Sequence, residues 1–127
     1  MKDGPVSITP EEANAKYTQA WSEPDVDKRL ELLEGSWADD GVFVDPEVPG
    51  GLVGRQALSD YITRSYEEMP GLKITLTSDP ETLGGRLRAR WVAVADSSET
   101  YTGTDFVEFS ADGRISQLTM FYNSTPG

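Results

Sequence analysis

The sequence predicts an α+β fold in which three N-terminal helices pack across a curved antiparallel sheet. Up to Met69 most apolar residues recur every three or four positions, which is typical of amphipathic helices. From Leu72 onward they alternate with polar residues, which is typical of half-buried strands. Because the helices precede the strands, the order favours α+β over a βαβ arrangement. The length fits one domain, expected over residues 1–127, with residues 1–8 as a flexible arm.

The first helix is expected to begin at Pro10 and to end before Pro24. Thr9 can cap it, and Glu12 completes a capping box three residues later. Proline suits the first helical position because its missing N–H would have no helical partner there. The apolar stripe of this helix consists of Ala13, Tyr17, Ala20 and Trp21.

The second helix is expected after Asp25, a favoured N-cap residue. Its apolar stripe consists of Val26, Leu30, Leu33 and Trp37. Asp39-Asp40-Gly41 then predicts the end of the helix and a turn. A short strand at 42–44 follows the turn and ends at Asp45.

The segment 47–54 is rich in glycine and proline, and we expect it to form a flexible loop or lid. A third helix is expected from Gly54 to Met69. Four strands are expected after it, at 72–76, 86–95, 100–109 and 114–123, with turns at 84–85, 96–99 and 111–113. Such a succession of hairpins predicts an antiparallel meander.

The composition excludes several classes of function. A net charge of −11 repels nucleic acid and disfavours anionic membrane surfaces. The chain has no cysteine and no histidine, so thiolate chemistry and the commonest metal ligand are missing, and we expect neither a metal nor a cofactor. No apolar run reaches the ~20 residues that span a bilayer. Since the first residues also lack the apolar core of a secretory signal, we expect a cytoplasmic location.

The most informative residue is Asp105, in the expected strand 100–109. It shares one face of that strand with Tyr101, Gly103, Val107 and Phe109. If this face is buried, the carboxylate must be paired, hydrogen-bonded or protonated. Two interpretations follow: a structural residue paired with Arg88 or Arg90 of the neighbouring strand, or a group that faces a ligand.

Asp45 is the second candidate, at the end of the expected strand 42–44. Asp-Pro often opens a turn, so one interpretation is purely structural. In the other, its carboxylate lies at the rim of a pocket. Asp45 and Asp105 would then form an acid–base pair, provided that their surroundings push the two pKa values apart.

The strand at 86–95 changes character at Trp91, which is expected in the core or in a pocket wall. Before this residue, one face carries three arginines. After it, both faces are apolar, because Val92 and Val94 lie opposite Ala93 and Ala95. A sheet that is apolar on both faces is covered on both, so we expect a homodimer through one of them.

Several motifs resemble the SnoaL-like family of the NTF2-like superfamily. They are WADDGVFVDP at 37–46, the entry into the third helix at 54–58, RARW at 88–91 and GTDFVEFSADGRISQLTMFY at 103–122. The resemblance covers about residues 12 to 123. It implies a cystatin-like cone of curved sheet around helices, with an internal pocket and often a dimer through the outer face. Carried over onto this chain, Asp45 and Asp105 would be the pocket carboxylates and Trp91 a wall residue.

The resemblance also implies a function. Members of the superfamily include polyketide cyclases and ketosteroid isomerase, so we expect a small apolar molecule as ligand. The chain would be a cofactor-independent isomerase or cyclase that acts on an apolar carbonyl compound by carboxylate acid–base catalysis, with Asp45 and Asp105 as catalytic residues. The absence of histidine argues against a histidine-assisted dehydratase. The expected ligand-binding residues are Tyr17, Trp21, Trp37, Tyr61, Trp91 and Phe121. The alternatives are a non-catalytic ligand-binding or dimerisation domain and, ranked last, a protein-interaction module.

Overall fold

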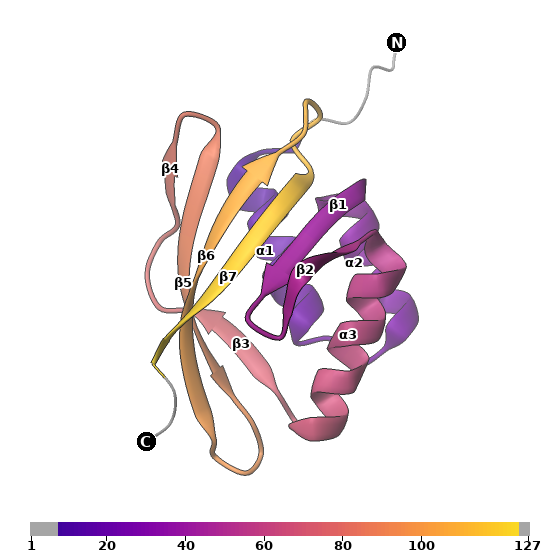
Figure 1. The fold of residues 1–127 in the computed structure, drawn as a ribbon, viewed down its shortest axis with the longest axis vertical. Helices are drawn as coiled ribbons and strands as arrows, with labels where there is room; N and C mark the ends of the chain where they lie inside the picture. The colour runs from indigo at the N-terminus through magenta and orange to yellow at the C-terminus, as the bar shows by residue number, and fades with distance from the viewer. Residues whose placement is uncertain (1–7, 125–127) are drawn as a thin grey trace.

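Three helices pack on the concave side of a curved seven-stranded sheet (Figure 1). The computed structural model describes residues 8–124, so the expected arm lies outside the described residues except for Ile8. The helices are α1 (Pro10–Trp21), α2 (Val26–Ser36) and α3 (Arg55–Glu68). The strands are β1 (Trp37–Asp45), β2 (Val48–Val53), β3 (Lys73–Leu76), β4 (Glu81–Leu83), β5 (Arg86–Val94), β6 (Thr100–Phe109) and β7 (Ile115–Ser124).

The sheet is mixed, with the strand order β2-β1-β7-β6-β5-β3 and with β4 paired to β5. The predicted meander is confirmed, because β3, β5, β6 and β7 pair antiparallel in succession. The prediction of a wholly antiparallel sheet is wrong at one place, since β1 lies parallel to β7. Parallel neighbours need a long crossover, and the chain between β1 and β7, with α3 and the meander, provides it.

Local signals in the sequence set the helix starts. The Thr9 side chain accepts the N–H of Glu12 at 3.1 Å, and Glu12 accepts the N–H of Thr9 at 3.0 Å, which confirms the capping box. Asp25 accepts the N–H of Lys28 at 3.1 Å and so caps α2. These bonds satisfy backbone donors that the first helical turn leaves without partners.

The region between α2 and α3 differs from the prediction. Trp37 begins β1 instead of ending a helix, and β1 runs through Asp39-Asp40-Gly41, where a turn was expected. The expected loop 47–54 contains β2, which forms a hairpin with β1 and pairs Phe43 with Leu52. β1 pairs with β7 at Trp37 and again at Val42, with a register shift between these two positions. Tertiary pairing on both sides of Asp39-Asp40-Gly41 therefore overrides the local turn propensity of this segment. The short strand β4, unexpected from the sequence, pairs with the start of β5.

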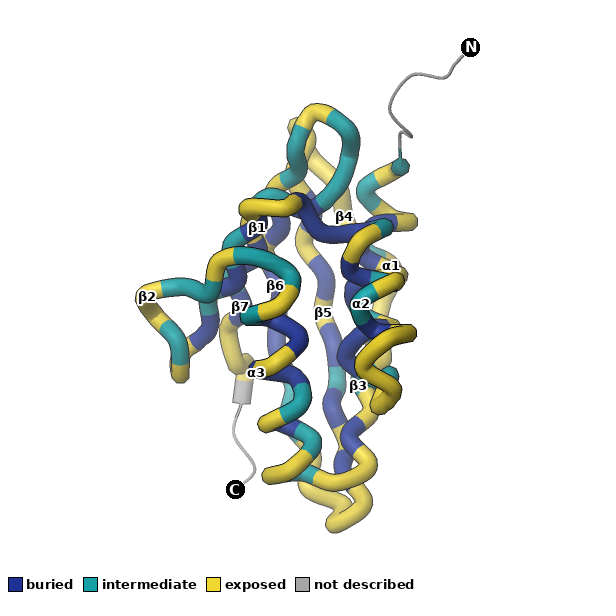
Figure 2. The backbone as a smooth tube through the Cα atoms, turned by 90° about the vertical axis from the view of Figure 1, so that its right-hand side faces the viewer, coloured by how far each residue is buried: buried dark blue, intermediate teal, exposed yellow. Residues whose placement is uncertain are grey.

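The core lies between the helices and the concave face of the sheet (Figure 2). Along β5 the burial alternates: Leu87, Ala89, Trp91 and Ala93 are buried, whereas Arg86, Arg88 and Arg90 are exposed on the outer face. The helices contribute Leu33, Leu58 and Ile62, all fully buried. Among the described residues, no helix is long and apolar enough to cross a membrane.

Candidate functional site

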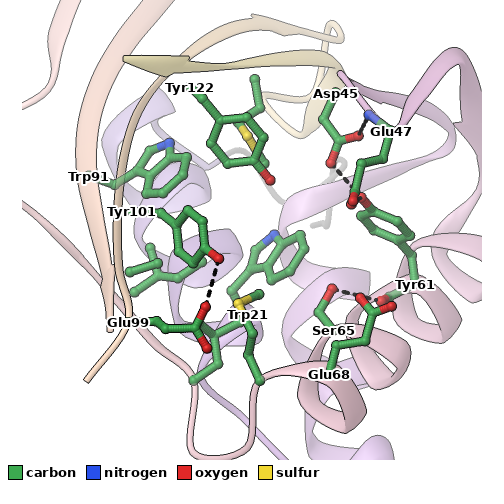
Figure 3. Close-up of a pocket in the computed structure, with 15 residues that line it drawn as sticks. Trp21, Asp45, Glu47, Tyr61, Ser65, Glu68, Trp91, Glu99, Tyr101 and Tyr122 are labelled. Atoms are coloured by element: carbon green, nitrogen blue, oxygen red, sulfur yellow. Dashed lines mark hydrogen bonds between the residues drawn. The ribbon is translucent and has the colours of Figure 1, made fainter. Parts of the chain in front are cut away.

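A cavity of about 350 Å³ lies between α3, the end of β1 and the concave face of the sheet (Figure 3). This volume falls within the range of small-molecule sites, roughly 300–1,000 Å³. Its walls combine aromatic, aliphatic and acidic side chains. They are Trp21, Asp45, Glu47, Tyr61, Ser65, Glu68, Met69, Leu72, Ile74, Trp91, Ala93, Glu99, Tyr101, Met120 and Tyr122.

Asp45, the last residue of β1, is the buried carboxylate of this cavity, with 2% of its surface exposed. Its Oδ1 accepts the backbone N–H groups of Glu47 at 2.8 Å and Val48 at 3.0 Å. Its Oδ2 accepts the Tyr61 hydroxyl at 2.7 Å. The β1–β2 hairpin therefore supplies the turn that was expected at Asp45, and the same residue also lies in the cavity wall.

The Tyr61 hydroxyl lies between two carboxylates. Besides Asp45 it contacts Oε2 of Glu47 at 2.9 Å. A phenol has one proton to donate, so it can serve only one of these carboxylates at a time. Burial, followed by the hydrogen bond to Asp45, holds the pKa of Tyr61 well above its usual range, so the phenol stays protonated.

Two more tyrosines line the sheet side of the cavity. The Tyr101 hydroxyl donates to Oε2 of Glu99 at 3.0 Å. The Tyr122 hydroxyl points into the cavity and has no hydrogen-bond partner among the described residues (Figure 3). Burial, with smaller contributions from Asp45 and Glu47, raises the pKa of Tyr122 to about 12. Tyr122 therefore brings an uncommitted proton donor to the cavity.

Asp105 lies behind Trp91 and outside the lining of the main cavity. Its Oδ1 accepts the Trp91 indole N–H at 3.0 Å, and 5% of its surface is exposed. Burial raises the pKa of Asp105 to about 7, and the indole hydrogen bond opposes the rise. Asp105 borders a separate hollow of about 10 Å³, which has room for about one water molecule.

Of the two interpretations of Asp105, the pairing with an arginine is wrong. Asp105 lies opposite Ala89 across the β5–β6 pair, so Arg88 and Arg90 point to the other face of the sheet. There Arg88 donates to Glu81 at 2.7 Å. The hydrogen-bond partner of Asp105 is instead Trp91, which lies two residues after Ala89 on β5. The sequence did not predict this partner.

The structure brings three of the six predicted binding residues to the cavity wall: Trp21, Tyr61 and Trp91. Tyr17 borders the small hollow near Asp105, where its oxygen accepts the Trp21 indole N–H at 2.8 Å. Trp37 is wholly buried in the core and stacks on Tyr17, so it does not line the cavity. Phe121 is 52% exposed and packs against Phe106 on the outer face.

Phe121 fails as a cavity residue because side chains alternate between the two faces of a strand. In β7 the residues on the inner face are Leu118, Met120 and Tyr122, so Tyr122 lines the cavity instead. That alternation was available in the sequence. No pattern in the sequence predicts that Glu47, Glu68 and Glu99 line the cavity, because turns and the end of a helix bring them there.

A curved mixed sheet that wraps three helices and leaves a lined cavity defines a cone of the NTF2-like class. The family model for the SnoaL-like domain matches residues 15–118, and the chain belongs to this family. A candidate isomerase of the SnoaL-like family from Agrobacterium tumefaciens is similar in structure, with a TM-score of 0.82 and 26% identity over 92% of this chain and 100% of that one.

Two other solved structures share the fold at lower identity. A candidate ketosteroid isomerase from Kribbella flavida has a TM-score of 0.71 and 18% identity, covering 93% of this chain and 80% of that one. A protein with a ketosteroid isomerase-like fold from Catenulispora acidiphila, in complex with trimethylamine, has a TM-score of 0.70 and 17% identity, covering 91% and 87%. The search of curated proteins found no match.

Proposed function

We propose that this protein binds a small carbonyl compound in the cavity and moves a proton at the carbon next to the carbonyl, as an isomerase or cyclase without a cofactor. The observation that carries the proposal is the buried carboxylate of Asp45 in the wall of a cavity large enough for such a ligand. Membership of the SnoaL-like family and the similarity to a candidate isomerase support the same class of reaction.

Asp45 is the proposed base. A carboxylate oxygen has two acceptor positions, and among the residues that the structure describes Oδ2 has one donor, the Tyr61 hydroxyl. One position on this oxygen therefore stays free for a substrate proton. The two backbone bonds to Oδ1 hold the carboxylate in one orientation. Fixed geometry of this kind lowers the cost of reaching the reactive arrangement.

The charge that develops on the carbonyl oxygen needs a donor. The Tyr122 hydroxyl is protonated, points into the cavity and is uncommitted among the described residues. We assign it this role. Asp105 enters the proposal as a positioning residue, because its hydrogen bond fixes the indole of Trp91, which forms part of the wall.

Exchange of protons for deuterium tests the proposal even where the product of the reaction is unidentified. Small ketones, cyclic enones and β-diketones are incubated with the protein in D₂O, and loss of the α-proton signals is followed by NMR. We expect exchange faster than in buffer, and a loss of roughly a hundredfold or more in Asp45→Asn, in line with the usual contribution of a general base. Glu108→Gln removes an exposed carboxylate of β6 and serves as the control. Exchange at the wild-type rate in a folded Asp45→Asn protein contradicts the assignment.

A second candidate function is a non-catalytic ligand-binding domain. Hydrogen bonds to both oxygens of Asp45, together with the position of Asp105 outside the main cavity, favour it. It predicts that compounds bind in the cavity and that no compound in the panel exchanges its α-protons faster than in buffer.

We also propose a homodimer through the outer face of the sheet, in a protein that acts in the cytoplasm. Val94, Phe106 and Phe121 are 42%, 46% and 52% exposed on that face, where a second copy would cover them. Sedimentation equilibrium of the wild type and of Phe106→Ser tests the proposal. A wild type that remains monomeric at high micromolar concentration contradicts it.

A further inference from the structure

Every charged side chain that lines the cavity is acidic. Asp45, Glu47, Glu68 and Glu99 contribute carboxylates, and no lysine or arginine between residues 8 and 124 belongs to the lining. The three arginines of β5 lie on the outer face of the sheet, whereas the cavity lies on its inner face. Among the described residues, one cation–π contact involves a lining residue: the guanidinium carbon of the exposed Arg64 lies 5.6 Å from the centre of the Tyr61 ring.

The same cavity is rich in aromatic rings. Trp91 and Tyr101 both pack against Tyr122, with ring centres 6.2 Å apart and planes tilted by 73° and 50°. Across the cavity, Trp21 meets Tyr61 edge to face at 6.1 Å. Rings set at such angles present π-faces and edges in several directions around one volume. Aromatic faces attract cations, and a cage of tilted rings is the common way to bind a quaternary ammonium group.

Taken together, the acidic and aromatic walls select against other ligands. An anionic ligand would meet carboxylates without a compensating base in the wall. A neutral ligand would gain no charge–charge attraction from these carboxylates. A bare metal ion is bound by several side chains that converge on it. The described residues contain no group of three carboxylates close enough together to bind a metal ion. An organic cation meets both features, because it spreads its charge over methyl or methylene groups that rings can surround.

We propose that the ligand of this cavity carries a positively charged nitrogen, as an ammonium group attached to a small apolar body. The inference rests on the proposed function and names its substrate class. Glu47, from the β1–β2 connection, and Glu99, from the turn before β6, lie on opposite sides of the cavity (Figure 3). The ammonium group lies in the field of both, and the apolar body contacts Leu72, Ile74 and Met120.

A cationic ligand also removes a difficulty of the proposed reaction. When Asp45 takes a proton from carbon, Asp45 becomes neutral and its negative charge passes to the ligand, which lies beside the carboxylates of Glu47 and Glu99. A positive nitrogen in the same molecule offsets that repulsion, because it attracts both the new negative charge and the carboxylates of the wall. The acidic walls therefore fit proton abstraction from a cationic substrate better than from a neutral one.

Three compounds of nearly equal shape test the inference: choline, the neutral 3,3-dimethylbutan-1-ol and the anionic 3,3-dimethylbutanoate. Binding is measured by calorimetry and by the fluorescence of the cavity tryptophans, with benzyltrimethylammonium as a larger cationic probe. We expect at least one ammonium probe to bind, choline to bind about tenfold tighter than the alcohol, and the anion to bind weakest, as cation–π and carboxylate attraction require.

Matched variants locate the effect. The double variant Glu47→Gln/Glu99→Gln is expected to weaken ammonium binding about tenfold and to leave binding of the alcohol unchanged. Glu108→Gln removes one negative charge on the outer face and is expected to change neither. Equal affinity for choline and the alcohol, unchanged ammonium binding in the double variant, or no binding of either ammonium probe overturns the inference. Binding is measured without turnover, so failure of the deuterium-exchange test leaves this result standing. When a ketone that carries a trimethylammonium group is added to the exchange panel, exchange of the neutral ketones alone overturns only the substrate class.

Discussion

The indole N–H of Trp91 donates to the carboxyl group of Asp105 at 3.0 Å, across the paired strands β5 and β6. Both residues are buried, and this is the one hydrogen bond found for the Asp105 side chain among the described residues. A single neutral donor compensates little of the cost of burying a charged carboxylate. Asp105 is therefore a site where protonation and stability are coupled.

We expect the free energy of unfolding to fall as the pH rises through the range from about 4 to 7. Burial raises the pKa of Asp105 to about 7 in the folded protein, from an ordinary value of 3.8. Between these values the folded state holds a proton that the unfolded state has lost, so folding is favoured at the acidic end and the advantage is gone above pH 7. The contribution amounts to at most about 4 kcal/mol. Urea denaturation at pH 5 and pH 8 measures it.

Asp105→Asn isolates this effect, because the amide has the shape of the protonated carboxyl group and can still accept from Trp91. The variant is expected to be more stable than the wild type at pH 8 and to lose most of the slope. Glu108→Gln, with its exposed side chain, should keep the wild-type slope. An unchanged slope in Asp105→Asn would show that other groups carry the dependence.

Gly103→Ala is expected to displace the indole of Trp91. Gly103 lies opposite Trp91 in the β5–β6 pair, and a Cβ atom there would overlap the indole ring and approach the Phe121 carbonyl oxygen to 2.7 Å. Overpacking of this kind costs about 1–3 kcal/mol. Denaturation and tryptophan fluorescence measure the loss and the altered indole environment. Gly50→Ala is the control, because a Cβ at Gly50 meets nothing within 4 Å.

Tyr61→Phe is expected to lower the free energy of unfolding by about 1.5–3 kcal/mol, the usual range for a hydrogen bond to a charged group. The change removes the hydroxyl that joins α3 to Asp45 and Glu47 but keeps the ring in contact with Phe43. Urea denaturation at neutral pH gives the value. Tyr101→Phe removes a more exposed hydroxyl that bonds to Glu99, and a similar loss there would contradict the special role of Tyr61.

Arg29→Met is expected to destabilise the protein by roughly 3 kcal/mol, because it leaves buried acceptors without donors. Arg29 is 1% exposed, and its guanidinium donates to the Ser59 carbonyl at 2.9 Å and to Thr63 at 2.7 Å, which ties α2 to α3. Equilibrium unfolding measures the loss. The neighbouring Lys28 is exposed, so Lys28→Met should change stability little. Equal effects of the two changes would mean that the contacts of Arg29 do not stabilise the fold.

The sequence by itself determined the features that depend on neighbours along the chain. The capping box at Thr9, the cap at Asp25 and the alternation in β5 and β6 are short-range patterns, and the structure has them where they were expected. The same alternation placed Asp105 on one face with Tyr101 and Val107, and the structure buries Asp105 and Val107. Periodicity and capping are local because they arise from the helix and strand geometry of a few residues.

Only the tertiary structure decided which of these elements meet. Pairing with β7 on both sides of Asp39-Asp40-Gly41 made this segment part of a strand. The β1–β2 hairpin brought Glu47 beside Tyr61. The choice of Trp91 as the partner of Asp105, and the separation of Asp105 from the main cavity, likewise depend on how the sheet curves over the helices. Contacts between distant segments depend on the summed packing of many side chains, and no local pattern of residues encodes that sum.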